Sequence, residues 1–383
     1  MKVDDVKKIA VIGAGDMGNG IAEVAILAGY EVAMRDIEQR FVDRGVDTIK
    51  KSLAKLVQKN KITEDASNGA LARLRPLVDL EEAVKDADFI IEAVPEIMDL
   101  KKSVFKDLDR LSPKHAILAT NTSNMSITEI ASATNREDKV VGMHFFNPAI
   151  LMKLVEVIKG EKTSDETVQI TYDISEKFGK VPVIVKKDSP GFIYNRVNAP
   201  TSLLISKIMD AGSPTPEEFD AAFKAIMPMT PFELADYVGL DVAYHSLKYF
   251  SEVLSPEYKP SKVLEEKVNA KELGKKTGKG FYDWSSGRPN IDTSKATKEF
   301  DINHLIALQV NEATKLLEEG VVDDPKVIDL AMANGGGAGI GPFTLAKSIG
   351  YETLVKKCEE LADKFKVEVF RPTKTMREGK INV

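Results

Sequence analysis

The stretch KIAVIGAGDMGNGIAEVAILAGYEVAMRD, residues 8–36, specifies the architecture of the first part of the chain. Residues 8–12 form an apolar run typical of a buried parallel strand, and residues 31–35 predict a second strand. The small, apolar residues 19–28 between them predict a helix that packs closely on a sheet, and Gly29 is a natural helix terminator. A strand, a helix and a strand within about 30 residues predict a βαβ unit.

The turn that follows the first strand reads GAGDMG. Gly13 permits the tight turn, Gly15 lets the backbone approach a pyrophosphate, and Gly18 lets the helix pack close to the sheet. The helix N terminus then presents free N–H groups to the phosphates. Asp36, at the end of the second strand, would bind ribose hydroxyls and repel a 2′-phosphate, so NAD is favoured. Arg35 beside it keeps NADP open, and an ordinary glycine turn is the structural alternative. The turn residues of this predicted NAD site are Gly13, Gly15, Asp16, Met17 and Gly18.

Strand-like runs alternate with helical stretches up to about residue 190. This alternation predicts an α/β Rossmann domain with a mostly parallel, doubly wound sheet over residues 1–190. After Gly191 the strand-like runs largely vanish, and helical periodicity predicts an all-α region. The strand-like runs beyond the first βαβ unit are residues 86–96, 116–123, 139–148, 153–160 and 181–191.

Two stretches in the helical part of the chain have similar sequences. PMTPFELADYVGLDVA at residues 228–243 aligns with GIGPFTLAKSIGYETL at residues 339–354. Two copies indicate a duplication, since a solenoid needs three or more units. We therefore expect an all-α domain in two tandem copies, residues 191–290 and 291–370, with chance similarity as the alternative. The polar residues 371–383 predict a linker-like tail.

Composition and charge exclude several classes of protein. The net charge of −6 over 383 residues argues against a nucleic-acid partner. Apolar runs fall short of the ~18–20 residues that a membrane helix needs, so no membrane association is expected. With no apolar signal segment before the first strand and a single cysteine, Cys358, we expect a cytoplasmic protein. The four histidines are scattered, so no metal site is predicted.

A candidate acid–base pair lies in two neighbouring strand-like runs. His144 and Glu156 are 12 residues apart, with the turn residues Asn147 and Pro148 between them. A carboxylate on one imidazole nitrogen fixes the tautomer and raises the basicity of the other nitrogen. Such a pair is suited to taking a hydroxyl proton near neutral pH. From spacing alone, a structural histidine is the alternative.

Other polar residues fit both a binding and a structural role. Ser123 and Asn195 could hydrogen-bond a substrate oxygen or could cap a helix. The basic stretch KKSLAKLVQKNK, residues 50–61, could meet phosphates or form a solvated helix face. The run GGGAG at residues 335–339 follows a helical stretch, so it predicts a loop rather than a phosphate site.

Six ordered motifs together resemble the 3-hydroxyacyl-CoA dehydrogenase family over about residues 7–285. The resemblance implies NAD-dependent oxidation of an (S)-3-hydroxyacyl-CoA thioester, with 3-hydroxybutyryl-CoA as the expected substrate, to the 3-ketoacyl-CoA. It also implies a Rossmann domain followed by a helical domain. The motifs are GAGDMG, NTSNMSI, GMHFFNPAILMKLVEVI, DSPGFIYNR, PMTPFELADYVGLD and KKTGKGFYDW.

The resemblance also implies roles for individual residues. His144 matches the catalytic base and Glu156 its orienting partner, while Ser123 and Asn195 match residues near the reacting oxygen. Contacts to CoA are implied for Ser52, Lys59 and Ser123. Contacts to NAD are implied for Asp36, Glu96, Lys101, Ser123, Asn147 and Lys276.

The second helical copy is a departure from the shortest members of this family. Because those members dimerise through the helical domain, we expect a monomer in which the two copies pack as a built-in pseudo-dimer. A homodimer is the alternative. The layout also resembles the dehydrogenase portion of fusions with an enoyl-CoA hydratase, so a hydratase partner is expected. Two other functions stay open: a dehydrogenase of a free hydroxy acid or sugar acid, and a non-catalytic NAD-binding structural protein.

Overall fold

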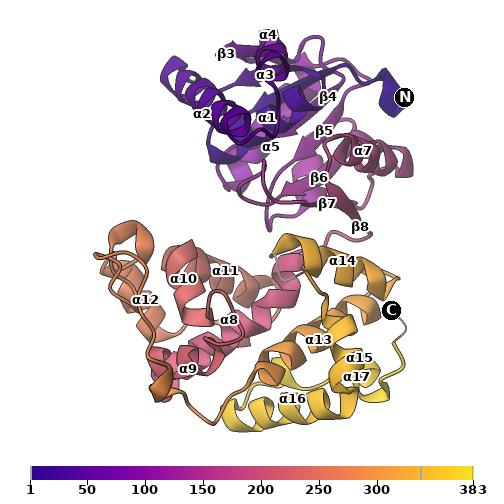
Figure 1. Cartoon of the computed structure of the whole chain (residues 1–383). Coiled ribbons are helices and arrows are strands. Elements are labelled where there is room, and N and C mark those ends of the chain that lie inside the picture. The colour runs from indigo at the N-terminus through magenta and orange to yellow at the C-terminus, as the bar shows by residue number, and fades with distance from the viewer. Residues whose placement is uncertain (1, 337–338, 382) are drawn as a thin grey trace. The chain divides into compact units, whose positions relative to one another are not determined.

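The computed structural model describes residues 2–336, 339–381 and 383. Its internal contacts divide the chain into two compact units, the first built around a sheet and the second helical. Figure 1 shows the elements of both units with their labels. The first unit comprises Met1–Tyr194 and Glu319–Gly341, and the second comprises Asn195–Glu318 and Pro342–Val383.

The first unit contains one eight-stranded sheet in the order β3-β2-β1-β4-β5-β6-β7-β8. All neighbouring strands are parallel except β6 and β7, which are antiparallel. The order reverses between β1 and β4, which is where doubly wound sheets bind ligands at the carboxyl ends of their strands. The predicted Rossmann-like parallel sheet is confirmed. The strands are β1 (Lys8–Ile12), β2 (Glu31–Arg35), β3 (Leu74–Leu77), β4 (Phe89–Glu92), β5 (Ile117–Thr120), β6 (Val140–Phe145), β7 (Leu154–Ile158) and β8 (Val181–Val185).

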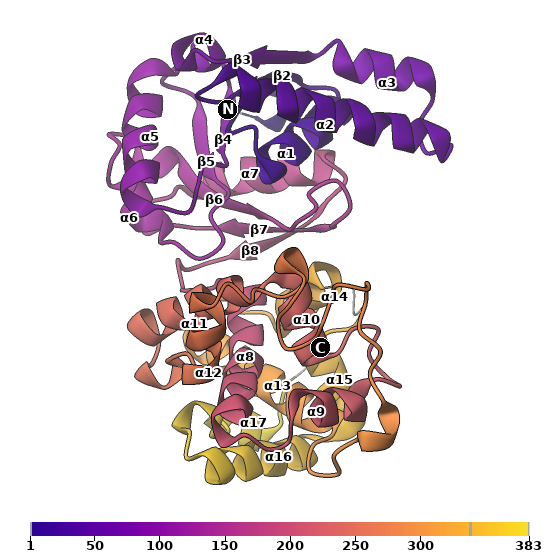
Figure 2. The same cartoon turned by 90° about the vertical axis from the view of Figure 1, so that its left-hand side faces the viewer.

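Helices cover both faces of this sheet, as a buried parallel sheet requires. Figure 2 shows α5 and α6 on one side of the sheet, and α1, α2 and α3 on the other. Helices α1, α2, α3 and α7 contribute apolar residues to one large core with β1 and β2. The helices are α1 (Asp16–Leu27), α2 (Gln39–Gln58), α3 (Glu64–Leu71), α4 (Leu80–Val84), α5 (Met98–Leu111), α6 (Ile127–Ala131), α7 (Asp165–Lys177) and α14 (Pro325–Gly335).

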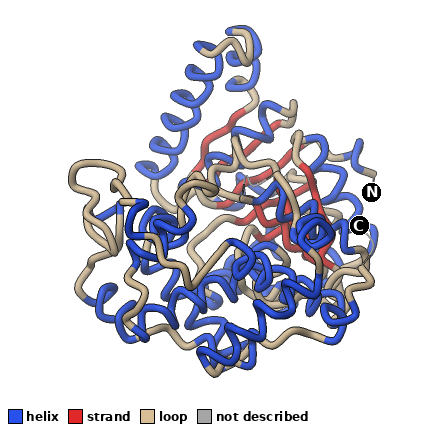
Figure 3. Tube along the Cα trace, turned by 60° about the horizontal axis from the view of Figure 1, so that its bottom comes forward, coloured by secondary structure: helices blue, strands red, loops and turns tan. Residues whose placement is uncertain are grey.

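The second unit is built from helices and loops, as the blue and tan segments of Figure 3 show. Its core is rich in aromatic rings, among them those of Phe219, Phe232 and Phe300. A helical C-terminal region after the sheet is thereby confirmed. The helices are α8 (Tyr194–Ala211), α9 (Pro216–Phe223), α10 (Pro231–Val238), α11 (Leu240–Val253), α12 (Lys262–Asn269), α13 (Ile302–Glu318), α15 (Pro342–Ile349), α16 (Tyr351–Phe365) and α17 (Lys374–Glu378).

The region expected as the second helical copy, residues 291–370, is divided between the two units. Its helix α14 contacts β7 and β8 and belongs to the first unit. The backbone N–H of Lys186 donates to the carbonyl of Val321 at 2.8 Å, which fastens the segment before α14 to the end of β8. The predicted GGGAG loop begins where α14 ends, and its residues 337–338 lie outside the described residues.

The structure differs from the linker that the sequence predicts for residues 371–383. This segment carries the helix α17, whose Met376 side chain is fully buried. The N–H of Thr373 donates to Oδ1 of Asn311 at 2.9 Å, and its hydroxyl lies 2.7 Å from that of Thr314. One apolar side chain and a capping threonine thus dock a polar segment on α13. Within the described residues, every helix falls short of the length or the apolar character needed to cross a bilayer.

Candidate active site

The glycine-rich turn between β1 and α1 has one open position and two crowded ones. Gly13 has a φ of +109°, and a Cβ there would lie 2.5 Å from the carbonyl oxygen of Ala93. A Cβ on Gly18 would overlap the carbonyl oxygen of Gly13. Apart from Gly15 itself and its two chain neighbours, no described residue has a heavy atom within 4 Å of the place where a Cβ of Gly15 would be. This open approach at the N terminus of α1 fits the pyrophosphate of a dinucleotide.

The carboxylate of Asp36 is fixed at the rim of the glycine turn. Its Oδ2 accepts from the N–H of Ala14 and its Oδ1 from the N–H of Ile37, both at 2.7 Å. The neighbouring Arg35, which left NADP open, donates from Nε to the carbonyl of Val78 at 2.8 Å. The negative group therefore borders the turn, and the guanidinium is tied to the residue after β3.

His144 and Glu156 form a buried pair across the antiparallel strands β6 and β7. They are directly opposite in the register, and His144 Nδ1 lies 2.7 Å from Glu156 Oε2. The two residues are 3% and 0% exposed. A carboxylate only accepts hydrogen bonds, so Nδ1 carries the hydrogen and Nε2 is left as a proton acceptor. The pair has the geometry that a general base requires.

Two backbone groups hold the Glu156 carboxylate from its other side. Its Oε1 accepts from the N–H of Ile193 at 3.0 Å and from that of Tyr194 at 2.9 Å. The ring of Phe146 lies 4.5 Å from the ring of His144. Since three hydrogen bonds fix the carboxylate, the imidazole that it holds has one orientation. Sequence reasoning missed these backbone donors because their residues carry no chemical signal of their own.

A buried ion pair organises the carboxyl ends of β4 and β5. Lys101 Nζ lies 2.8 Å from Glu92 Oε1 and 3.0 Å from Glu96 Oε2, and Lys101 is only 1% exposed. Glu96 Oε1 accepts from the Thr122 hydroxyl at 2.6 Å and from the N–H of Ser123 at 2.7 Å. The Lys101 ammonium is enclosed by protein groups, so it acts on the site by holding Glu96. Glu92 is a member of this network that the sequence prediction omitted.

Lys180 supports the turn between β6 and β7 on which Asn147 is exposed. Its Nζ donates to the carbonyl oxygens of Ala149 and Met152, the latter at 2.9 Å. Burial lowers the pKa of Lys180 to about 8. A Cβ on Gly20 of α1 would lie 3.2 Å from Cβ of Ala149, so the turn also packs on that helix. The sequence gives no signal for Lys180, because helix α7 separates it from the turn.

The two residues expected to contact CoA lie on α2. Ser52 is half-buried and lies near Glu23 of α1, whose pKa burial raises to about 7. Lys59 is the exposed C-cap residue of the same helix. A spacing of seven residues is about two helical turns, so both side chains are on one side of α2.

Two expected site residues belong to the helical unit. Asn195 is the second residue of α8, directly after Tyr194. Lys276 pairs with the carboxylate of Asp241. The loop that carries Lys276 is held by the buried Asp236, which accepts from the N–H of Tyr282 and from Trp284 Nε1, both at 2.9 Å. Sequence reasoning did not identify Asp236 as the organiser of this loop.

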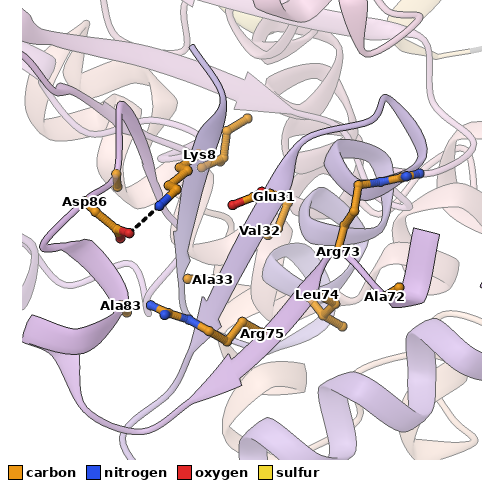
Figure 4. Close-up of a pocket in the computed structure, with 12 residues that line it drawn as sticks. Lys8, Glu31, Val32, Ala33, Ala72, Arg73, Leu74, Arg75, Ala83 and Asp86 are labelled. Atoms are coloured by element: carbon orange, nitrogen blue, oxygen red, sulfur yellow. Dashed lines mark hydrogen bonds and ion pairs between the residues drawn. The ribbon is translucent and has the colours of Figure 1, made fainter. Parts of the chain in front are cut away.

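A cavity of about 390 Å³ lies at the other ends of the strands, as Figure 4 shows. Its wall includes Lys8 and Glu31 at the starts of β1 and β2, and Lys8 Nζ pairs with Asp86 at 2.6 Å. Ligands of doubly wound sheets bind at the carboxyl ends of the strands, so this cavity is separate from the candidate site. In the part of the chain that the structure describes, no group of three or more His, Cys, Asp or Glu residues could hold a metal ion.

Two protein-family models match nearly the whole chain. The model described as 3-hydroxyacyl-CoA dehydrogenase, NAD binding domain, matches residues 8–189. The model described as 3-hydroxyacyl-CoA dehydrogenase, C-terminal domain, matches residues 191–284 and 300–379.

Relatives and solved structures agree with these matches. The 3-hydroxybutyryl-CoA dehydrogenase of Clostridioides difficile is 43% identical over 281 residues, which cover 73% of this chain and 99% of the relative. The fatty acid oxidation complex subunit alpha of Psychrobacter cryohalolentis is 35% identical over 387 residues, covering 94% of this chain but only 53% of that relative. The structure of 3-hydroxybutyryl-CoA dehydrogenase from Escherichia coli K12 has a TM-score of 0.90 and 29% identity, covering 97% of this chain and 98% of that one.

Proposed function

The chain belongs to the 3-hydroxyacyl-CoA dehydrogenase family, and from this premise we propose that it oxidises (S)-3-hydroxybutyryl-CoA to the 3-ketoacyl-CoA. It is an NAD-dependent oxidoreductase. The observation that carries the proposal is the buried His144–Glu156 pair, joined at 2.7 Å. A histidine so held is a suitable acceptor for the proton of a secondary hydroxyl.

In the proposed mechanism, His144 Nε2 accepts the proton of the 3-hydroxyl group while that carbon loses a hydride. NAD, when bound, supplies the acceptor for the hydride. Glu156 keeps the imidazole oriented and stabilises the imidazolium that forms. Ser123 and Asn195 hydrogen-bond the substrate oxygen as it becomes a carbonyl oxygen. A positioned general base of this kind contributes roughly 10²–10⁴-fold to the rate.

The proposed cofactor contacts follow from the groups around the glycine turn. Asp36 binds the adenosine ribose, and Glu96 and Asn147 bind nearer the nicotinamide. Lys101 contributes by holding Glu96, which its ion pair at 3.0 Å supports. Lys276 contributes from the helical unit. The proposed CoA contacts are Ser123 and the α2 residues Ser52 and Lys59.

Initial rates test the proposed substrate and cofactor together. We expect fast NADH formation from (S)-3-hydroxybutyryl-CoA and slow or no reduction with free 3-hydroxybutyrate, a sugar acid or NADP. Equal rates with the thioester and a free acid would overturn the proposal in favour of a hydroxy-acid dehydrogenase. The absence of turnover with every substrate, in both directions, would favour an NAD-binding protein without catalysis.

We propose further that the first helical segment, residues 191–290, and the second, residues 291–370, form a pseudo-dimer within one chain. Asn198 and Gln309, 111 positions apart, hydrogen-bond to each other at 2.9 Å, as equivalent residues do beside a two-fold axis. The match of one domain model to two ranges supports this proposal. Light scattering should report a monomer of 42.1 kDa, and a tight dimer would contradict it.

We propose an enoyl-CoA hydratase as the partner enzyme, whose reaction supplies the 3-hydroxyacyl-CoA substrate. The similarity to a protein named as a fatty acid oxidation complex subunit supports it. The chain alone should form no NADH from crotonyl-CoA, and added hydratase should start the reaction. NADH formation from crotonyl-CoA without added hydratase would contradict the need for a partner.

A further inference from the structure

Helix α14 of the second helical segment packs on the sheet that carries the His144–Glu156 pair. It contacts β7, which holds Glu156, and the edge strand β8. Its side chains of Ile328 and Ala331 are fully buried. The segment before it is anchored by the bond between Lys186 and Val321. The end of α14 therefore has a fixed position on the catalytic unit.

Two glycines at the end of α14 make room for the ring of Tyr194. A Cβ on Gly335 would lie 2.5 Å from Cδ2 of Tyr194 and 2.9 Å from Cδ2 of Leu154. A Cβ on Gly336 would overlap the Tyr194 hydroxyl oxygen. Contacts this close force neighbouring atoms to shift, since packed interiors yield little space. The backbone of α14 thus forms a wall against which Tyr194 rests.

Tyr194 contacts Glu156 directly and is linked to His144 through Phe146. Its backbone N–H donates to Glu156 Oε1 at 2.9 Å. Its ring meets the ring of Phe146 edge-on at 5.1 Å, and the Phe146 ring lies 4.5 Å from that of His144. A displacement of Tyr194 would therefore reach the carboxylate through the backbone and the imidazole through Phe146.

We infer that Gly335 and Gly336 are positioning residues for the His144–Glu156 pair and act on it through Tyr194. The second helical segment then contributes to catalysis as well as to packing within the helical unit. This inference rests on the proposed function, because its effect is measured on oxidation of the thioester.

The first test compares Gly335→Ala with Gly69→Ala. A Cβ on Gly69, in α3, would meet no described heavy atom within 4 Å, so this variant is the matched control. We expect Gly335→Ala to lower kcat for 3-hydroxybutyryl-CoA by roughly 10–100-fold, the scale of a small misplacement of catalytic groups. NAD affinity should stay unchanged, and the pH profile of kcat/KM should shift. The Gly69→Ala enzyme should keep wild-type values.

Double variants separate positioning from a general loss of structure. In a Tyr194→Ala background the ring atoms that meet the new Cβ are absent, so Gly335→Ala should have a smaller further effect on kcat. Where Gly335→Ala does not fold, Gly336→Ala decides, and Tyr194→Phe should restore that variant because it removes the hydroxyl. Wild-type kcat and pH profiles in both glycine variants would overturn the inference, as would an undiminished loss in the Tyr194→Ala background. Failure of the wild-type enzyme to oxidise the thioester would instead overturn the proposed function.

Discussion

Helix α10 of the first helical segment and helix α15 of the second begin and end in the same way. The two helices differ in the groups that surround them. Each begins with a buried proline and a fully buried phenylalanine, Phe232 or Phe343. Each ends at a glycine with positive φ, 120° at Gly239 and 96° at Gly350, from which the next helix starts. At both places the repeated sequence pattern therefore carries a short helix, a glycine with positive φ and a following helix.

The difference lies in one position on the two helices. Asp236 of α10 is fully buried and accepts hydrogen bonds from the N–H groups of Phe281 and Tyr282 and from Trp284 Nε1. The position 111 residues later on α15 carries the exposed Lys347. A buried carboxylate that meets three donors can hold a loop, and an exposed ammonium cannot hold it in this way. The local sequence therefore determines the two helices, and the single buried carboxylate of Asp236 determines that a loop binds to only one of them.

The largest expected effect comes from removing Asp236. Asp236→Ala leaves three donors of the loop without their acceptor, which should lower the free energy of unfolding by about 3–5 kcal/mol. Lys347→Ala is the matched control and should change it by less than about 0.5 kcal/mol. Urea denaturation measures both, and equal losses in the two variants would contradict the assigned difference.

Gly239 and Gly350 test whether the two helix junctions are equally crowded. Gly239→Ala and Gly350→Ala should each lower the free energy of unfolding by about 1–3 kcal/mol, since a side chain is strained at positive φ. Gly239→Ala should lose more, because its Cβ would lie 2.8 Å from Asp241 Oδ1 and 2.9 Å from Lys276 Nζ. The Cβ of Gly350→Ala would meet, among described atoms, only Thr353 Oγ1 at 4.0 Å. A greater loss for Gly350→Ala would reverse this ranking.

Removal of the hydrogen bond between the two segments should have a smaller effect on the free energy of unfolding. Gln309→Met removes the donor to Asn198 and should cost about 1 kcal/mol of unfolding free energy. In an Asn198→Ala background the same change should cost less, because its partner is already absent. Additive losses would show that these residues do not couple the segments.

A buried carboxyl group outside both segments, Glu23, gives a pH reference for these comparisons. Burial raises the pKa of Glu23 to about 7 from an ordinary 4.5, so Glu23 stabilises the fold less as pH rises through this window. Glu23→Gln should raise the thermal midpoint relative to wild type at pH 8 more than at pH 5. The same difference at both values would show that Glu23 does not titrate there.

Local patterns were sufficient to predict the sheet and the pairing of His144 with Glu156. The glycine turn, Asp36 and the alternation of strands and helices predicted the Rossmann-like unit. The strands around the Asn147 turn predicted that His144 and Glu156 meet, and the structure joins them at 2.7 Å. Both predictions rest on short sequence separations, over which strand pairing follows from chain geometry.

Long-range packing could not be predicted in the same way. Helix α14 reads as one more amphipathic helix of a helical region, yet it packs on β7 and β8 more than 130 residues earlier in the chain. The resemblance implies an NAD contact for Lys101, whereas the structure buries its ammonium in ion pairs with Glu92 and Glu96 at the ends of β4 and β5. Which helix packs on which strand depends on the apolar faces that remain uncovered once the sheet has formed.

The most direct test of the central claim is the turnover of (S)-3-hydroxybutyryl-CoA by His144→Gln, with NAD binding measured on the same preparation. The account predicts a fall in kcat of roughly 10²–10⁴-fold with unchanged NAD affinity, because the base is lost and the glycine turn is intact. Turnover near that of the wild type would contradict the assignment of His144 as the base.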